Sequence, residues 1–150
     1  MSLEQEFELT RRVPIFSTTD PSMQKLLAFS SDRLTYEEGQ LMFSAGDPPD
    51  SAYIVMEGEV DITVPTAKGP LLVNTLTRND VIGEIGIFGD VPRTATAVAR
   101  TRVEALRISR DVFVNVIRSN PDAAIALVKI LADRLAKTTA QLRRMAAETR

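Results

Sequence analysis

The stretch GEIGIFGDVPRTATA, from Gly83 to Ala97, decides the interpretation of this chain. Three evenly spaced glycines are followed by one arginine, Arg93, which stands between Pro92 and a run of small residues. The neighbours of Arg93 are mostly apolar or small, so the nearby sequence supplies no partner for a permanent charge. We therefore expect the partner of Arg93 to be a ligand.

The composition excludes several kinds of chemistry. The chain has 150 residues, no cysteine and no histidine. Its length suits one domain spanning residues 1–150, and the missing residue types remove disulfides, thiolates, the usual zinc ligands and imidazole bases. No nucleophile elbow, Walker loop or Ser-x-x-Lys signature is present. We predict a binding module that is not an enzyme, with no catalytic residue, metal or cofactor.

Charge and hydropathy indicate where the chain acts. The first residues, MSLEQEFEL, carry three glutamates where a secretory signal has a basic start and an apolar core. No apolar run approaches the ~20 residues of a membrane span. The net charge of -2 disfavours a generic nucleic-acid binder. We expect a cytoplasmic chain without a membrane partner or direct DNA binding, and the Met-Ser-Leu start also fits a piece of a longer protein.

The middle of the chain has the pattern of an antiparallel β-structure. Between residues 33 and 108, short apolar or alternating segments are separated by turn residues such as Glu57-Gly58-Glu59. Such a series closes most readily into a sandwich, jelly roll or barrel. The expected strands are 33–36, 41–44, 51–57, 60–65, 71–76, 94–99 and 102–108.

Helical patterns flank this region. N-terminal helices are expected within residues 1–32, where Asp20 can cap a helix and Pro21 suits its first position. C-terminal helices are expected within 109–146. Ser109 is a plausible cap for a short helix over 111–117, and a long helix should run from Asn120-Pro121 to about residue 145.

The long helix carries a stripe with alternating spacings of three and four, formed by Val128, Leu131, Leu135, Thr138, Leu142 and Met145. This pattern is typical of a coiled-coil seam, which would give a homodimer through the C-terminal helix. It is equally typical of a helix that packs on its own domain. The scattered basic residues of the helix are interpreted as its solvated face.

The chemistry of residues 83–97 indicates a nucleotide. Their glycines do not match the dinucleotide fingerprint, and no strand-helix-strand unit surrounds them. A short helical turn over 84–88 would point free N–H groups at an anion. Arg93 offers a forked donor for two phosphate oxygens, with N–H groups of Thr94 and Ala95 nearby. Glu84 would repel a phosphate, so we expect it to accept a hydrogen bond from a sugar hydroxyl.

Two segments, Gly83-Glu84-Ile85-Gly86-Ile87-Phe88 and Pro92-Arg93-Thr94-Ala95-Thr96-Ala97, together resemble a known motif. They are similar to the phosphate-binding cassette of the cyclic-nucleotide-binding domain family, found in kinase A regulatory subunits, the bacterial catabolite activator and cyclic-nucleotide-gated channels. The resemblance extends from about residue 12 to about residue 141. It implies an eight-stranded jelly-roll-like β-roll, or double-stranded β-helix, over 33–108, flanked by N-terminal helices, a hinge helix and a long C-terminal helix.

Two positions depart from the family pattern. Asn79 and Ile82 stand where the family often has glycine and phenylalanine. Asparagine tolerates left-handed backbone and isoleucine fills a core site, so neither departure argues against binding.

The resemblance implies a non-catalytic sensor or regulatory domain for cAMP or cGMP. Glu84 would hold the ribose 2′-hydroxyl, Arg93 the cyclic phosphate, and backbone amides near Gly86 and Ala95 would complete the cradle. Thr94 bears on base selectivity but does not decide between cAMP and cGMP. The ligand-binding residues expected are Gly83, Glu84, Ile85, Gly86, Arg93, Thr94 and Ala95, with Val64 and Leu76 as base-pocket walls and Arg134 as a cap.

In this family the last helix caps the base, and ligand binding would move the helices after Ser109. The cap candidates here are Leu131, Arg134, Leu135 and Thr138. Arg134 would stack on a base or, alternatively, lie in water.

Other interpretations stay open at this point. Arg93 can instead form a surface ion pair with Asp90 or Glu84. The chain can be a dimerisation or regulatory module that no longer senses a nucleotide. It can also be the sensor part of a larger channel, kinase or transcription factor, acting on an unknown downstream protein.

Overall fold

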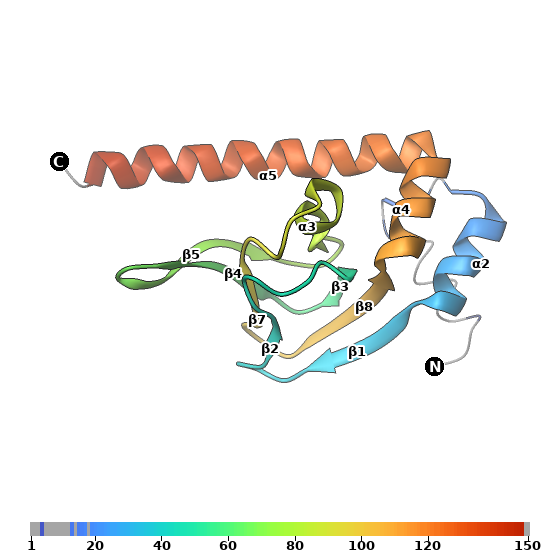
Figure 1. Ribbon diagram of the computed structural model, residues 1–150, viewed down its shortest axis with the longest axis horizontal. Helices are drawn as coiled ribbons and strands as arrows, with labels where there is room; N and C mark the ends of the chain where they lie inside the picture. The colour runs from blue at the N-terminus through green and yellow to red at the C-terminus, as the bar shows by residue number, and fades with distance from the viewer. Residues whose placement is uncertain (1–3, 5–12, 14, 18, 149–150) are drawn as a thin grey trace.

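The computed structural model describes residues 4, 13, 15–17 and 19–148. Most of residues 1–12, the first part of the region 1–32 in which N-terminal helices were expected, therefore lies outside the described residues. Within the described part, eight strands form two antiparallel four-stranded sheets, ordered β1-β8-β3-β6 and β2-β7-β4-β5 (Figure 1). The strands are β1 Asp32–Tyr36, β2 Leu41–Phe43, β3 Ser51–Glu57, β4 Val60–Thr66, β5 Gly69–Leu76, β6 Val81–Ile82, β7 Thr96–Ala99 and β8 Val103–Ser109. The expected eight-stranded jelly-roll-like β-roll is confirmed.

One strand was not expected from the sequence, and another is shorter at its start than expected. β6 has only two residues, Val81–Ile82, too few for an alternating pattern to be recognised. The strand expected over 94–99 begins only at Thr96. Just before it, Gly46 N donates to Arg93 O at 2.8 Å and Arg93 N donates to Asp47 O at 2.8 Å. The backbone at Arg93 therefore pairs with a turn instead of the sheet.

The described residues form four helices, which flank the β-roll along one side and at one end (Figure 1): α2 Pro21–Ser30, α3 Glu84–Gly89, α4 Arg110–Ser119 and α5 Pro121–Glu148. Both expected caps are present. The Asp20 carboxylate accepts a hydrogen bond from Met23 N at 3.0 Å, and the Ser109 hydroxyl accepts one from Val112 N at 3.4 Å. These caps satisfy N–H groups that the first helical turn leaves free.

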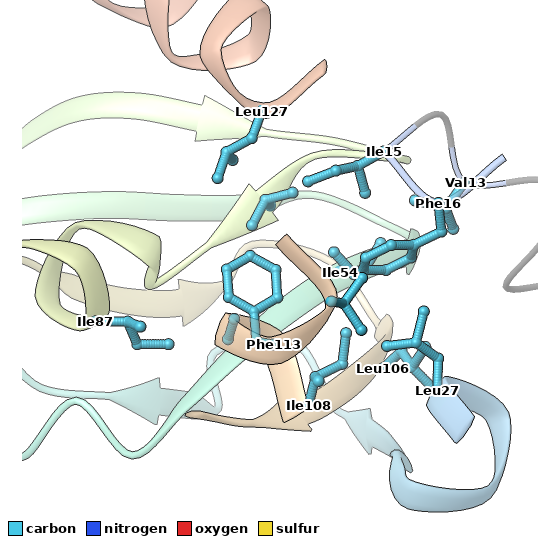
Figure 2. Close-up of a cluster of buried hydrophobic side chains, with 13 residues drawn as sticks. Val13, Ile15, Phe16, Leu27, Ile54, Ile87, Leu106, Ile108, Phe113 and Leu127 are labelled. Atoms are coloured by element: carbon cyan, nitrogen blue, oxygen red, sulfur yellow. The ribbon is translucent and has the colours of Figure 1, made fainter. Parts of the chain in front are cut away.

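The hydrophobic core has two parts, one on each face of β3. Alternation along this strand sends Ile54 toward the helices and Val55 toward the second sheet. On the helical side, side chains from the N-terminal segment, β3, β8, α3, α4 and α5 converge around Phe113 (Figure 2). Ile87 of α3 and Leu127 of α5 both belong to this cluster, so the core holds α3 and the first part of α5.

The long helix α5 runs along one side of the molecule and passes over α3 (Figure 1). Further along the helix, Gln141 Nε2 donates to Leu72 O of β5 at 3.5 Å. The helix therefore covers the region between α3 and β5. None of the described helices combines the length and hydropathy needed to cross a membrane.

The stripe expected on α5 is divided between two faces. Val128, Leu135 and Leu142 are 59%, 68% and 58% exposed. The other three members, Leu131, Thr138 and Met145, are half-buried. Polar contacts explain the division: Arg134 and Gln141 are bonded to the domain and fix the rotation of the helix, so the inward face is partly polar.

Candidate ligand-binding site

One cavity of about 200 Å³ collects all ten residues predicted to bind ligand. They come from segments far apart in sequence: β4, β5, α3, the loop before β7, and α5. Six further residues line the cavity and were not predicted as ligand-binding residues, although Thr138 was named as a cap candidate: Phe43, Ile62, Val73, Asn74, Ile82 and Thr138. Ile62 and Asn74 lie two residues before Val64 and Leu76 on the same strands, so the alternation of side chains along a strand would have been enough to predict them.

Glu84 is the first residue of α3, and its side chain is 1% exposed. Its Oε1 accepts a hydrogen bond from Arg134 Nη1 at 2.7 Å, while Oε2 has no protein partner. Burial raises the pKa of the Glu84 carboxyl, and the nearby charge of Arg134 opposes this with a smaller effect. One oxygen of a buried carboxylate thus remains available as an acceptor.

Arg134 connects α5 to the floor of the cavity. Besides Glu84, it bonds the backbone of β6, because Nη2 donates to Val81 O at 2.7 Å. The Thr138 hydroxyl, one turn later, donates to Arg134 O at 2.9 Å. Arg134 is therefore held by the protein and does not lie in water, the second environment expected for it; stacking on a base stays a prediction. Among the other cap candidates, Leu135 is exposed and does not line the cavity.

Arg93 is 4% exposed and already has protein partners, whereas the sequence led us to expect a ligand as its partner. Nη2 donates to Ser51 O at 2.6 Å and Nη1 donates to Gly83 O at 3.0 Å. The guanidinium also lies 4.3 Å from the ring centroid of Phe43, a cation–π contact. Burial lowers the pKa of Arg93, although an arginine stays charged under such conditions.

The ion pairs considered for Arg93 from the sequence are wrong. Asp90 instead pairs with Arg110 at 3.2 Å, and Glu84 pairs with Arg134. The carboxylate nearest to Arg93 belongs to Asp50, with 3.5 Å between Nη2 and Oδ1. Arg93 Nε, however, is buried and has no partner.

The two glycines of the cavity serve close packing. Gly83 has a φ of 91°, in the left-handed region, and a Cβ there would overlap Arg93 Nη1. A Cβ on Gly86 would lie 2.9 Å from Pro49 Cβ. We expected these glycines to let the backbone approach a ligand; in the structure they let α3 approach its own neighbours.

Two of the three buried side-chain polar atoms that lack a partner in the described residues belong to this cavity: Glu84 Oε2 and Arg93 Nε. An unsatisfied buried group costs about 1–3 kcal/mol, so such atoms need an explanation. One is an acceptor and the other a charged donor. A ligand that carries both a hydroxyl group and an anionic oxygen would satisfy the two together.

The remaining predicted residues lie at the two ends of the cavity, which differ in chemistry. Thr94 and Ala95 lie just before β7, next to Arg93, and Thr94 is exposed. Ile85 lines the cavity although its side chain is 53% exposed. At the other end, β4 and β5 provide an apolar wall that includes Val64 and Leu76.

Comparisons with known proteins agree with this geometry. A profile of the cyclic nucleotide-binding domain matches residues 33–120. The CRP-like cAMP-activated global transcriptional regulator of Mycobacterium tuberculosis is 31% identical over 137 residues, which cover 90% of this chain and 61% of that protein. The cAMP-dependent protein kinase regulatory subunit of Aspergillus niger is 34% identical over 101 residues, which cover 67% of this chain and 24% of that protein.

A solved structure extends the likeness. The N-terminal domain of a transcriptional regulator from Streptomyces coelicolor A3(2) aligns with a TM-score of 0.64 and 32% identity, over 87% of this chain and 94% of that one. The chain spans less than two thirds of the length of both curated relatives described above. Because transcriptional regulators are among the relatives, the comparisons do not support the expectation of no direct DNA binding.

Proposed function

The chain belongs to the cyclic nucleotide-binding domain family, and from that premise we propose that it is a non-catalytic sensor whose cavity binds a cyclic nucleotide. The observation that carries the proposal is the pair of buried atoms without a partner, Glu84 Oε2 and Arg93 Nε. A ribose hydroxyl is a donor for the first, and a cyclic phosphate is an anionic acceptor for the second. The regulatory relatives are consistent with binding in place of catalysis.

In the proposed complex, Arg93 pairs with the phosphate and Glu84 accepts from the 2′-hydroxyl. Backbone amides at or near Gly86 and Ala95 complete the phosphate cradle. The base then extends toward the apolar wall of β4 and β5. Both curated relatives described above are named for cAMP, so cAMP is the first ligand to test and cGMP the second.

Ligand binding would move α4 and α5. The cavity of about 200 Å³ is smaller than the roughly 300–1,000 Å³ of most ligand pockets. Arg134 holds α5 on it through Glu84 and Val81 O. A nucleotide that engages Glu84 and needs more room favours a position of α5 in which these two bonds are rearranged. The shift is limited by the difference in nucleotide affinity between the two positions.

The experiment uses calorimetric titration with cAMP and 2′-deoxy-cAMP against wild-type protein and Glu84→Ala. Structural damage from the substitution affects both ligands and cancels in the ratio of the two affinities. We expect Glu84→Ala to weaken cAMP more than 2′-deoxy-cAMP, because only cAMP loses a hydrogen bond. Equal weakening of the two ligands contradicts the role of Glu84, and no binding to the wild-type protein contradicts the proposed function.

The exposed face of α5 favours a second role, dimerisation. Val128, Leu135 and Leu142 are spaced seven residues apart and are all more than half exposed. Apolar residues repeated every seven positions on an exposed helix are typical of a coiled-coil seam. We propose a homodimer through this face. Sedimentation should give a dimer for the wild-type protein and a monomer for Leu135→Glu; a wild-type monomer contradicts this role.

The chain is proposed to be the sensor part of a cytoplasmic regulator that passes the ligand signal to another domain or a downstream protein. Support comes from the relatives, of which this chain matches only a part.

A further inference from the structure

Asn74 is the polar member of the wall that β4 and β5 contribute to the cavity. The other members of this wall are Ile62, Val64, Val73 and Leu76. Asparagine is unfavourable in strands, and the Asn74 side chain is half-buried. Its amide forms no hydrogen bond with any residue that the structure describes. The amide is not among the buried polar atoms that lack a partner, so solvent reaches it and it is free to pair with a ligand.

The register of β4 and β5 aims this side chain at the cavity. Asn74 lies opposite Ile62, and directly opposed residues of antiparallel strands present their side chains on the same face. Between Ile62 and Thr63 the register shifts, so that Val73 is an extra residue. This β-bulge lets both Val73 and Asn74 line the cavity, whereas successive residues of a regular strand point to opposite faces.

Asn74 belongs to the end of the cavity away from Glu84. Along α5, Arg134 bonds Glu84, and Gln141 bonds Leu72 O of β5 about 10 Å further on. Asn74 is two residues from Leu72 on that strand. With the phosphate at Arg93 and the ribose at Glu84, as the proposed function has it, the base is the part of the ligand that reaches Asn74.

We propose that Asn74 reads the base and favours adenine over guanine. A carboxamide presents one donor group beside one acceptor. Adenine offers the complementary pair on both of its edges, N6 with N7 and N6 with N1. Guanine offers two acceptors, O6 and N7, on one edge and a matching pair only on the other. Asn74 therefore suits adenine in either orientation of the base, and guanine in one.

The test rests on the proposed function and separates the two. Affinities for cAMP, cGMP and the cyclic phosphate of purine riboside, which lacks the 6-amino group, are measured by calorimetry at fixed salt. The proteins are wild type, Asn74→Ala, the isosteric Asn74→Asp and the control Val73→Ala. Val73 lines the same wall without a polar group, so it reports the effect of changing the wall alone.

Asn74→Ala should weaken cAMP about 5- to 100-fold and the 6-unsubstituted analogue by a clearly smaller factor. Asn74→Asp, which only accepts hydrogen bonds when ionised, should lower the ratio of cAMP to cGMP affinity. Val73→Ala should change all three ligands by similar factors. An Asn74→Ala variant that weakens all three equally, or none, overturns the base-reading role while the proposed function stands. A wild-type protein that binds none of the three contradicts the proposed function itself, and the role of Asn74 with it.

Discussion

The two ends of the cavity are built in opposite ways. At the α3 end, Glu84 and Arg93 are 1% and 4% exposed, and each is bonded to protein groups. At the β4–β5 end, Asn74 is the polar member of an otherwise apolar wall, in which Leu76 is buried and the other side chains are half-buried. Substitutions at a buried ion pair are strongly destabilising, because removing one partner leaves the other as an unpaired buried charge. Under the proposed function, the α3 end would select the class of ligand and the β4–β5 end would select the base.

The largest loss of nucleotide affinity is expected from replacing Arg93 at the α3 end. In Arg93→Glu the donor is lost and the new charge repels the phosphate, so nucleotide affinity should fall by about 2–5 kcal/mol, or roughly 30- to 5,000-fold. Calorimetry measures the loss. Arg110→Glu is the control, because Arg110 is a half-exposed arginine outside the cavity.

Because Arg93 also bonds Ser51 and Gly83, Arg93→Glu can unfold the protein. Arg93→Lys retains the charge without the fork and provides a second variant. Its thermal midpoint is measured without ligand. A folded Arg93→Lys or Arg93→Glu protein with wild-type affinity would contradict the assignment of this end to the phosphate.

A smaller effect is expected from Gly83→Ala, which tests how rigid the α3 end is. The left-handed backbone alone costs an alanine about 1–2 kcal/mol, and the overlap of its Cβ with Arg93 adds to this loss. Gly39→Ala is the matched control, because Gly39 has a φ of 85° and open space around it. Urea unfolding should show a larger loss for Gly83→Ala than for Gly39→Ala. Equal losses would mean that the α3 end relaxes around the added methyl group.

The smallest effect is the pH dependence of stability. Burial raises the pKa of Glu84 above its value in the unfolded chain, so the native state binds the proton more tightly. The Glu84 contribution to the free energy of unfolding therefore falls as pH rises from the ordinary carboxyl pKa to the raised native one. Glu84→Gln removes this contribution, so its stability relative to wild type should increase with pH over this range.

In Arg134→Met, the fall in stability due to Glu84 should continue to higher pH, because the substitution removes the charge that opposes the rise in the Glu84 pKa. Lys137→Met is the control, since Lys137 is exposed on the same helix and pairs with Asp133. Urea unfolding between about pH 4 and pH 8 measures each variant. If the stability of Glu84→Gln had the same pH dependence as that of the wild type, burial would not raise the pKa of Glu84.

Features formed by residues close together in the sequence could be predicted. The segment 83–97 is local, so its glycines, Glu84 and Arg93 could be recognised together. Helix caps are equally local, and both Asp20 and Ser109 were found. Asn79 adopts the left-handed φ of 74° that its place in a glycine position requires.

Contacts between distant segments could not be predicted. Ser51 lies 42 residues from Arg93, and Arg134 lies 50 residues from Glu84. No periodicity indicates which polar side chain of α5 turns inward, so the stripe on that helix was assigned to one face instead of two. The alternation of side chains along β5 would have been enough to place Asn74 beside Leu76 in the cavity wall. The bulge that also brings Val73 into this wall depends on the pairing of β4 with β5.

Cyclic-nucleotide binding is tested most directly by calorimetric titration of wild-type protein, shown to be free of carried-over nucleotide, with cAMP, cGMP and 5′-AMP. We expect saturable binding of a cyclic nucleotide, tighter for cAMP than for cGMP, and much weaker binding of 5′-AMP, which lacks the cyclic phosphate. Absence of binding by both cyclic nucleotides would contradict the proposed function and leave dimerisation through α5 as the proposed role.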